Sequence, residues 1–212
     1  MGESPFGVVY DSGKSEIFVT NYEYNSVSVI SDSSNNVVTT VPVGEYPQAA
    51  ACDFSMGEIF VANYKSYSIS VISDSSNSVV TNVTLGASPI GLAYDSAKGE
   101  IFVTSSNSIS VISDSNNTVI ATVPVGASPA SLAYDSAKGE IFVANTNDGT
   151  VSVISDASST TTSPSPTVPE FSAATFTLAV IALIAVTLRA VASKLKNTRQ
   201  FRDKVVHAPV CC

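Results

Sequence analysis

Four aspartates recur at equivalent places in the sequence, each closing a short run of β-forming residues: Asp11, Asp53, Asp95 and Asp135. If a fold brought them to one mouth of a central channel, their carboxylates would attract cations. An aspartate at the end of a strand can instead accept hydrogen bonds from the backbone of the next turn. We favour this capping role, because no histidine, unrepeated carboxylate pair or lone nucleophile interrupts the pattern in residues 1–156.

Three loops place oxygen-bearing side chains at alternate positions, loosely as calcium loops do: DSSNN at 32–36, DSSNS at 74–78 and DSNNT at 114–118. A calcium ion takes about six to eight oxygen ligands, usually from several carboxylates. Each loop offers one aspartate and no fixed glycine, so we predict turns between strands. The only histidine is His207, in the tail, which excludes a histidine-ligated copper site in residues 1–156. We expect no metal and no cofactor.

The three cysteines do not form a disulfide framework, because Cys52 lies more than 150 residues from Cys211 and Cys212. In the other repeats a tyrosine stands where this chain has Cys52, so we predict a small buried apolar side chain and not a reactive thiol. The terminal Cys211-Cys212 pair superficially resembles a prenylation signal. No other eukaryotic sign accompanies it, and we do not expect that modification.

Two sequences fit the acceptor pattern for N-glycosylation, Asn82-Val83-Thr84 and Asn116-Asn117-Thr118. Asn116 is predicted on a turn and is the more accessible, whereas Asn82 is predicted in an outer strand. Such patterns also arise by chance in Ser/Asn-rich sequence, so modification of Asn82 and Asn116 stays open.

These residues sit within an internal repeat. Its clearest marker occurs four times, as EIFVTN at 16–21, EIFVAN at 58–63, EIFVTS at 100–105 and EIFVAN at 140–145. The spacing is 42, 42 and 40 residues, and SVISD, beginning at 28, 70, 110 and 152, keeps the same phase. The one shortening falls in a loop of the third copy, where a structural repeat tolerates it.

Each repeat holds four short β-rich runs separated by turn residues, which is the size of one β-propeller blade. The run I-F-V is apolar at consecutive positions, so both faces of that strand must be covered. The last run tolerates Pro42 and Pro124, which places it at the outer edge of the sheet. We therefore predict an all-β fold: a β-propeller of four-stranded blades in sequence order from inner to outer, with repeats at about 1–42, 43–84, 85–124 and 125–156.

The motifs EIFVTN, EIFVAN, VSVISD and the VG-x-x-P step resemble the YVTN β-propeller repeat of archaeal surface-layer proteins and some bacterial proteins. Phe stands here where the family's name has Tyr, and Ser105 replaces the Asn of the third copy. The resemblance covers residues 1–156. It implies the propeller fold and leaves function open, because the family includes enzymes, binding proteins and structural surface proteins.

Fifteen strands are predicted, and neither end offers a spare strand to close a ring. Met1-Gly2 aligns with Val43-Gly44, Leu85-Gly86 and Val125-Gly126 of the later repeats, and the segment MGESPFGVVYD lacks the features of a signal peptide. We therefore expect an incomplete ring and a chain that is the C-terminal part of a longer protein or has a misassigned start. A compact four-bladed closure is the alternative.

The C-terminal quarter has a different composition. Residues 157–170 are a Ser/Thr/Pro-rich stalk, and eighteen uncharged residues separate Glu170 from Arg189. We predict a transmembrane helix over 171–192 followed by a basic cytoplasmic tail over 193–212, with the propeller outside by the positive-inside rule. Pro169, Glu170 and Phe171 before the apolar span resemble a PEF-CTERM sorting motif. The long tail departs from that pattern, which favours a retained anchor.

The net charge also differs between the repeat region and the C-terminal segment. Residues 1–156 hold four basic and sixteen acidic residues, a net charge of −12, whereas residues 189–212 hold six basic and one acidic. An acidic propeller repels phosphate backbones, so no nucleic-acid partner is expected. We expect a non-enzymatic cell-surface scaffold, surface-layer or adhesion module, with the membrane and other surface proteins or glycans as partners. The alternative is an enzymatic or ligand-binding propeller, lactonase-like or quinoprotein-like, with its site in missing blades.

Overall fold

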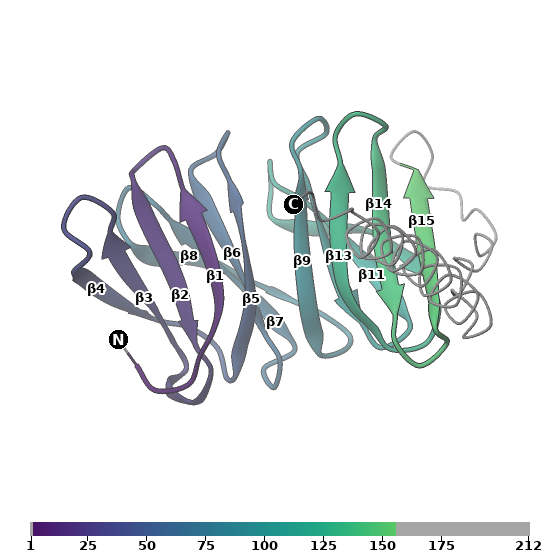
Figure 1. The fold of residues 1–212 in the computed structure, drawn as a ribbon, viewed down its shortest axis with the longest axis horizontal. Coiled ribbons are helices and arrows are strands. Elements are labelled where there is room, and N and C mark those ends of the chain that lie inside the picture. The colour runs from purple at the N-terminus through teal and green to yellow at the C-terminus, as the bar shows by residue number, and fades with distance from the viewer. Residues whose placement is uncertain (1, 156–212) are drawn as a thin grey trace, which may run out of the picture. The chain divides into compact units, whose positions relative to one another are not determined.

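The computed structural model describes residues 2–155, which fold into four antiparallel sheets (Figure 1). The first sheet comprises β1 (Pro5–Asp11), β2 (Glu16–Asn21), β3 (Ser26–Ser31) and β4 (Val37–Pro42). The second comprises β5 (Pro47–Asp53), β6 (Glu58–Asn63), β7 (Ser68–Ser73) and β8 (Ser78–Thr84). The third comprises β9 (Pro89–Asp95), β10 (Glu100–Ser105), β11 (Ser108–Ser113) and β12 (Thr118–Pro124). The fourth comprises β13 (Pro129–Asp135), β14 (Glu140–Asn145) and β15 (Thr150–Ser155).

The sheets confirm the predicted all-β propeller blades. Within each sheet the strands pair in sequence order. The first strands β1, β5, β9 and β13 pack against one another in turn, so they are the inner strands. Pro42 and Pro124 end the outer strands β4 and β12, where the missing N–H of proline costs no ladder hydrogen bond.

Each sheet has two apolar faces, because residues on a strand alternate in direction. One is called the Phe face and carries the phenylalanine of the EIFV run: Phe18, Phe60, Phe102 or Phe142. The opposite one is called the Ile face and carries the isoleucine of that run: Ile17, Ile59, Ile101 or Ile141. The cross-strand register keeps the faces separate, since Phe18 lies opposite Val9 and Val29.

The core lies between sheets, where the Phe face of one sheet packs on the Ile face of the next. Phe18 and Val27 of the first sheet cluster with Ile59 of the second. Phe60 clusters with Ile101 in the same way, and Phe102 with Ile141. Full burial of each such side chain stabilises the fold by roughly 1.5–3 kcal/mol, so these three boundaries dominate its stability.

Polar side chains tie neighbouring inner strands together. The Thr20 hydroxyl donates to the Gln48 carbonyl at 2.7 Å, and the Gly7 N–H donates to Thr20 Oγ1 at 2.7 Å. A Cβ at Gly7 would collide with the Gln48 carbonyl oxygen, so this close approach requires glycine.

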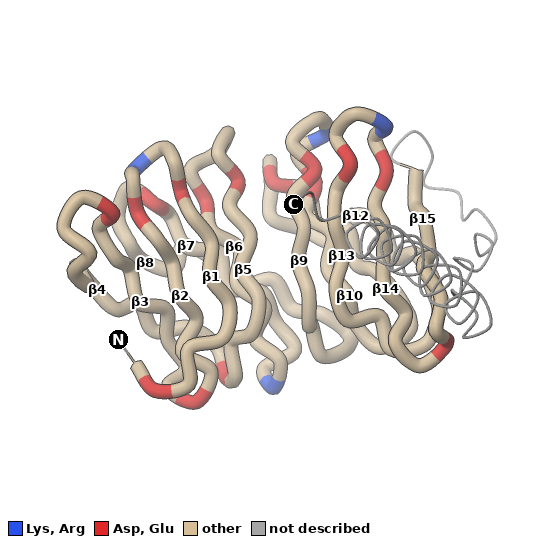
Figure 2. The backbone as a smooth tube through the Cα atoms, viewed as in Figure 1, with Lys and Arg blue, Asp and Glu red and all other residues tan. Residues whose placement is uncertain are grey.

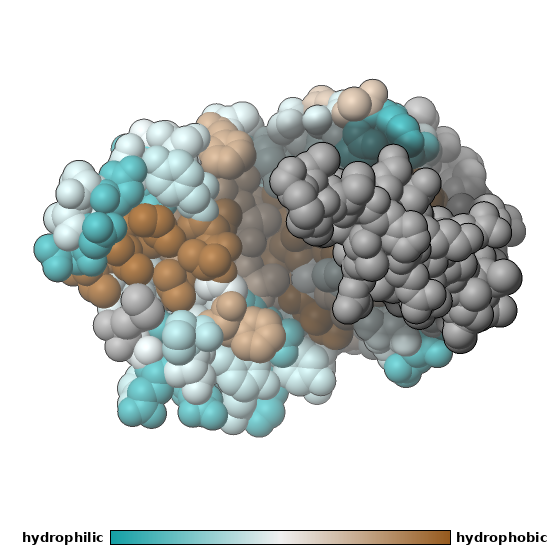
Figure 3. Space-filling model, in the orientation of Figure 1, coloured by the Kyte–Doolittle hydropathy of each residue, from teal (hydrophilic) through white to brown (hydrophobic). Residues whose placement is uncertain are grey.

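The four sheets form an open arc. Within residues 2–155, strands of the first sheet are not among those packed extensively against strands of the fourth. Accordingly, the Ile face of the first sheet is open to solvent: Val8 is 68% exposed and Tyr10 is 47% exposed. Figure 3 shows this face as an apolar area over β1–β3. The predicted partial ring is confirmed, and the alternative four-bladed closure is not what the described residues form.

Candidate functional site

The recurring aspartates lie on one rim of the arc, called the Asp rim, where the inner strands end (Figure 2). In each, Oδ1 accepts a hydrogen bond from a backbone N–H two residues further on. The distance is 2.8 Å for Asp11 and Gly13, 2.8 Å for Asp53 and Ser55, 2.9 Å for Asp95 and Ala97, and 3.0 Å for Asp135 and Ala137. The predicted capping role is therefore confirmed.

Between the second and third sheets, the Asp rim carries a chain of hydrogen bonds. Ser55 Oγ donates to Asp53 Oδ1 at 2.8 Å and lies 3.0 Å from the Tyr94 hydroxyl, which donates to Asp114 Oδ2 at 3.3 Å. Burial and the neighbouring Asp53 carboxylate raise the pKa of Asp114. Burial also opposes ionisation of Asp53, but hydrogen bonds from Ser55 and Tyr94 outweigh it, so the pKa of Asp53 is lowered.

Glu58 belongs to the same boundary. Its pKa is raised by burial and by the nearby Asp53 and Asp114 carboxylates, against the hydrogen bond from the Asn117 side chain at 3.3 Å. No group of three or more His, Cys, Asp or Glu side chains within residues 2–155 is arranged to hold a metal ion. The cluster can share protons and connect two blades.

The three loops that loosely resemble calcium loops are turns between the third and fourth strands of their sheets, as predicted. In each, the asparagine N–H donates to a carbonyl four residues earlier, as Asn77 does to Ser73 at 2.9 Å. The asparagines have positive φ, 53° for Asn35, 49° for Asn77 and 55° for Asn117. Asparagine adopts this left-handed conformation more readily than most residues, which explains its place in the turn.

Cys52 is buried at 4% exposure and packs in the core between the first and second sheets, so the predicted structural role is confirmed. Burial and the nearby Asp11, Asp53 and Asp74 carboxylates raise the pKa of the thiol to about 12. A thiol with this pKa forms almost no thiolate at neutral pH and is a poor nucleophile.

Both candidate glycosylation acceptors, Asn82 and Asn116, are exposed. Asn116 lies in the turn between β11 and β12, and its Oδ1 accepts bonds from the Thr118 N–H at 3.2 Å and hydroxyl at 2.6 Å. Asn82 lies in the outer strand β8, where its Oδ1 accepts a hydrogen bond from Ser70 at 2.8 Å.

The most distinctive surface feature was not foreseen from the sequence. It is an aromatic cluster on the rim opposite the Asp rim, called here the aromatic platform: Phe6, Tyr22 and Tyr46, with Lys65 beside them. The rings of Phe6 and Tyr22 stack with centroids 5.8 Å apart, and Tyr22 meets Tyr46 edge to face at 4.7 Å. Lys65 Nζ lies 3.9 Å from the Tyr46 ring centroid, a cation–π contact.

The platform breaks the repeat symmetry. It depends on a 3₁₀ turn, η1 (Tyr22–Tyr24), and on the loop at 64–67, which join second and third strands in the first two sheets. Both loops are tyrosine-rich, and their Tyr24 and Tyr67 are 56% and 52% exposed. The corresponding loops of the third and fourth sheets contain no aromatic residue. This asymmetry was the available signal, visible as YEY and YKSY in only two of four repeats.

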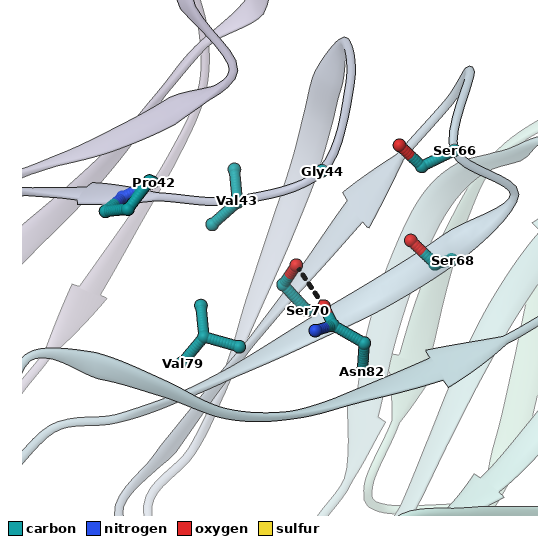
Figure 4. A pocket seen from close by; sticks show the side chains of 8 residues that line it. All are labelled: Pro42, Val43, Gly44, Ser66, Ser68, Ser70, Val79 and Asn82. Atoms are coloured by element: carbon teal, nitrogen blue, oxygen red, sulfur yellow. Dashed lines mark hydrogen bonds between the residues drawn. The ribbon is translucent and has the colours of Figure 1, made fainter.

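A neutral pocket of about 330 Å³ is lined in part by Ser66, which belongs to the same 64–67 loop as Lys65 of the platform (Figure 4). Its walls are formed by the end of β4 and the linker before β5, by the 64–67 loop, and by strands β7 and β8: Pro42, Val43, Gly44, Ser66, Ser68, Ser70, Val79 and Asn82. Ser66 Oγ accepts a hydrogen bond from the Glu45 N–H at 2.6 Å, which ties the linker to the tyrosine-rich loop. The pocket offers hydroxyl and amide groups and no charged side chain, so it suits a neutral polar ligand.

Several predictions concern residues outside those that the structure describes: the stalk at 157–170, the apolar span at 171–192, the tail at 193–212, and Pro169, Glu170 and Phe171. Cys211, Cys212 and His207 also lie outside them. No helix within residues 2–155 has both the length and the apolar character needed to cross a membrane.

Comparison with solved structures identifies the fold. Hydrazine synthase of Kuenenia stuttgartiensis matches 74% of this chain with a TM-score of 0.68 and 19% identity, over 48% of its own chain. A streptogramin B lyase matches 79% with a TM-score of 0.65 and 17% identity, over 56% of its own chain. The WD40 repeats of RRP9 match 72% with a TM-score of 0.63 and 19% identity, over 48%.

The chain is therefore similar in fold to β-propeller proteins and spans about half the length of these neighbours. No protein-family model and no curated protein sequence matches it significantly. At identities below one in five the likeness concerns the fold alone, and the site must be judged on its own residues.

Proposed function

We propose that this protein is a membrane-anchored cell-surface β-propeller, similar to the YVTN repeat proteins of archaeal surface layers, that acts as a non-enzymatic scaffold and adhesion module. The observation that carries the adhesion role is the aromatic platform. Phe6 is 67% exposed on a rim where two further tyrosines are more than half exposed. Such a concentration of solvent-exposed rings is a feature of binding surfaces.

The recurring polar side chains support a scaffold over a catalyst, because the blades use them for their own hydrogen bonds. The four rim aspartates cap turns. Asn63 donates to Ser68 at 3.3 Å and to Ser70 at 2.9 Å, and Asn145 makes the equivalent bonds to Thr150 and Ser152. The aspartate contacts occur in all four blades and the asparagine contacts in the first, second and fourth, as structural contacts do, whereas the platform occurs once.

The platform and the adjoining pocket together fit a ligand with a flat apolar face and several hydroxyl groups, which is the chemistry of a saccharide. Rings offer broad, rigid contact area, and Ser and Asn offer adaptable hydrogen bonds. We assign surface glycans, or a glycosylated surface protein, as the partner of this site. A glycan attached to Asn82 would occupy the pocket, so attachment there and ligand binding exclude each other.

The cell-surface location rests on the C-terminal sequence. Eighteen uncharged residues follow Glu170, and six basic residues follow the span. The span has the length needed to cross a bilayer, and by the positive-inside rule the basic residues favour a cytoplasmic tail. Pro169, Glu170 and Phe171 mark the point at which a sorting enzyme would act if the anchor is exchanged instead of retained.

The binding role is tested on whole cells that display the full chain. Phe6→Ser combined with Tyr46→Ala should reduce binding to an array of surface glycans by about tenfold or more, since each ring contact contributes roughly 0.5–1.5 kcal/mol beyond its buried area. Phe54→Ser is the matched control, because Phe54 is 60% exposed but follows Asp53 on the opposite rim. Equal binding by both variants would refute the platform as the site. Hydrolysis of a lactone, or quinone-dependent oxidation, by the purified full chain would favour the enzymatic alternative.

A further inference from the structure

The two end faces of the arc are complementary to each other. The first sheet presents an uncovered Ile face, on which Ile17 and Ile30 are half-buried. Their counterparts Ile59 and Ile72 in the second sheet are fully buried, as are Ile101 and Ile112 in the third. The difference arises because only the later sheets have a Phe face packed against them.

The fourth sheet presents the opposite kind of face. Its Phe face carries Phe142 and Val151, which are both half-buried. The equivalent Phe18 and Phe60 are fully buried, and Phe102 is 3% exposed, in each case against the next sheet. The arc thus ends in one face of each kind, and the molecule contains three examples of how such faces pack together.

We propose that two copies of this chain associate head to tail, with the Phe face of the fourth sheet of each copy on the Ile face of the first sheet of the other, to close an eight-bladed ring. Head-to-tail contacts form a closed ring when the rotation from one copy to the next fits a whole number of times into a full turn. With two copies, the two identical contacts are related by a two-fold axis. Eight blades lie within the range of about four to eight found in propellers. The arc matches only 48–56% of the propeller chains to which it is similar, so two arcs approach one full length.

A polar contact at the existing boundaries predicts the register of the new one. The side chain of Asn77 donates to Glu16 of the preceding sheet at 3.4 Å, and that of Asn117 donates to Glu58 at 3.3 Å. The equivalent residues at the ends of the arc are Asn35, which is exposed, and Glu140. In the closed ring Asn35 of one copy donates to Glu140 of the other.

The mass of the purified full chain in mild detergent tests this inference. We expect twice the chain mass of 21.9 kDa after the detergent contribution is subtracted. Val8→Glu should reduce it to one chain mass, because it places a carboxylate in the apolar contact. Val8 is 68% exposed in a single copy, so the substitution leaves the fold intact. Val80→Glu is the matched control: Val80 is 53% exposed on the outer strand of the second sheet, away from both end faces, and its variant should keep the double mass.

A second pair of variants tests the register. Asn35→Asp retains a residue that tolerates the left-handed turn but sets a carboxylate opposite Glu140, and should lower the fraction of paired chains. Combining it with Glu140→Lys should restore pairing. A single chain mass at every concentration, open polymers of growing mass, or a Val8→Glu variant that keeps the double mass would each overturn the two-copy ring. None of these outcomes depends on where the protein resides or what the platform binds.

Discussion

Replacing Phe60 with alanine tests the packing between blades at its centre. Phe60 is fully buried, and it lies in the cluster that joins the second sheet to Ile101 and Val103 of the third. Phe→Ala in a core typically costs about 3–5 kcal/mol, the lost transfer free energy plus the cavity that remains. Close-packed strands on both sides of Phe60 limit collapse of that cavity, so we expect the upper half of the range.

Urea unfolding followed by circular dichroism measures the change in the free energy of unfolding. In a domain of about 150 residues the same loss lowers the melting temperature by roughly 2–4 °C per kcal/mol. Phe54→Ala is the matched control in the turn that follows β5 of the same blade, since Phe54 is 60% exposed, and it should change stability by less than about 0.5 kcal/mol. A Phe60→Ala cost below about 1 kcal/mol, or equal costs for both variants, would refute the described packing.

Three further predictions concern the polar sites. Asp114→Asn should stabilise the protein at pH 7 by less than about 1 kcal/mol. The folded state raises the pKa of Asp114 above its ordinary 3.8, so the gain in stability should vanish as the pH falls through that raised pKa and wild-type Asp114 becomes protonated. Urea unfolding at pH 7 and pH 4 measures the gain. A gain that does not change with pH would contradict the raised pKa of Asp114. Cys52 should resist iodoacetamide at pH 8 in the folded protein and react in denaturant, as peptide mass spectrometry would reveal; native labelling would refute its burial. Asn63→Ala should cost about 1–3 kcal/mol by leaving Ser68 and Ser70 without their donor, and a neutral effect in urea unfolding would show that water replaces it.

The blades were predictable because their physics is local and repeated. The sequence predicts a strand at 58–63 that is covered on both faces, and β6 occupies those residues, with Ile59 and Phe60 fully buried on opposite faces. Pro42 and Pro124 indicated the outer strands for a similar reason, because a proline cannot donate a ladder hydrogen bond at its own position. The repeat period showed which residues are equivalent in successive blades, and each additional copy of the repeat supported the same alignment.

The aromatic platform and the Asp53–Tyr94 cluster were not predictable in the same way. Tyr22 and Tyr46 meet across the linker between the first two sheets, where the Tyr46 N–H donates to Asn25 Oδ1 at 3.0 Å. Tyr94 reaches Ser55 across a blade boundary, from 39 residues away in the sequence. Such contacts depend on the rotation between blades, which a repeat pattern does not specify. In the first three sheets the pairing between the third and fourth strands shifts register, and the repeat pattern does not predict this shift either.

We propose that the propeller is displayed outside the cell, and labelling of lysines on intact cells with a membrane-impermeant amine reagent tests this placement. All four lysines of the propeller are exposed: Lys14, Lys65, Lys98 and Lys138. Three lysines follow the apolar span: Lys194, Lys196 and Lys204. If the propeller faces outward, mass spectrometry should find the label on the first group only in intact cells, and on both groups once the cells are permeabilised. Label on the second group alone in intact cells, or on neither group before permeabilisation, would rule out an outward-facing propeller with a cytoplasmic tail.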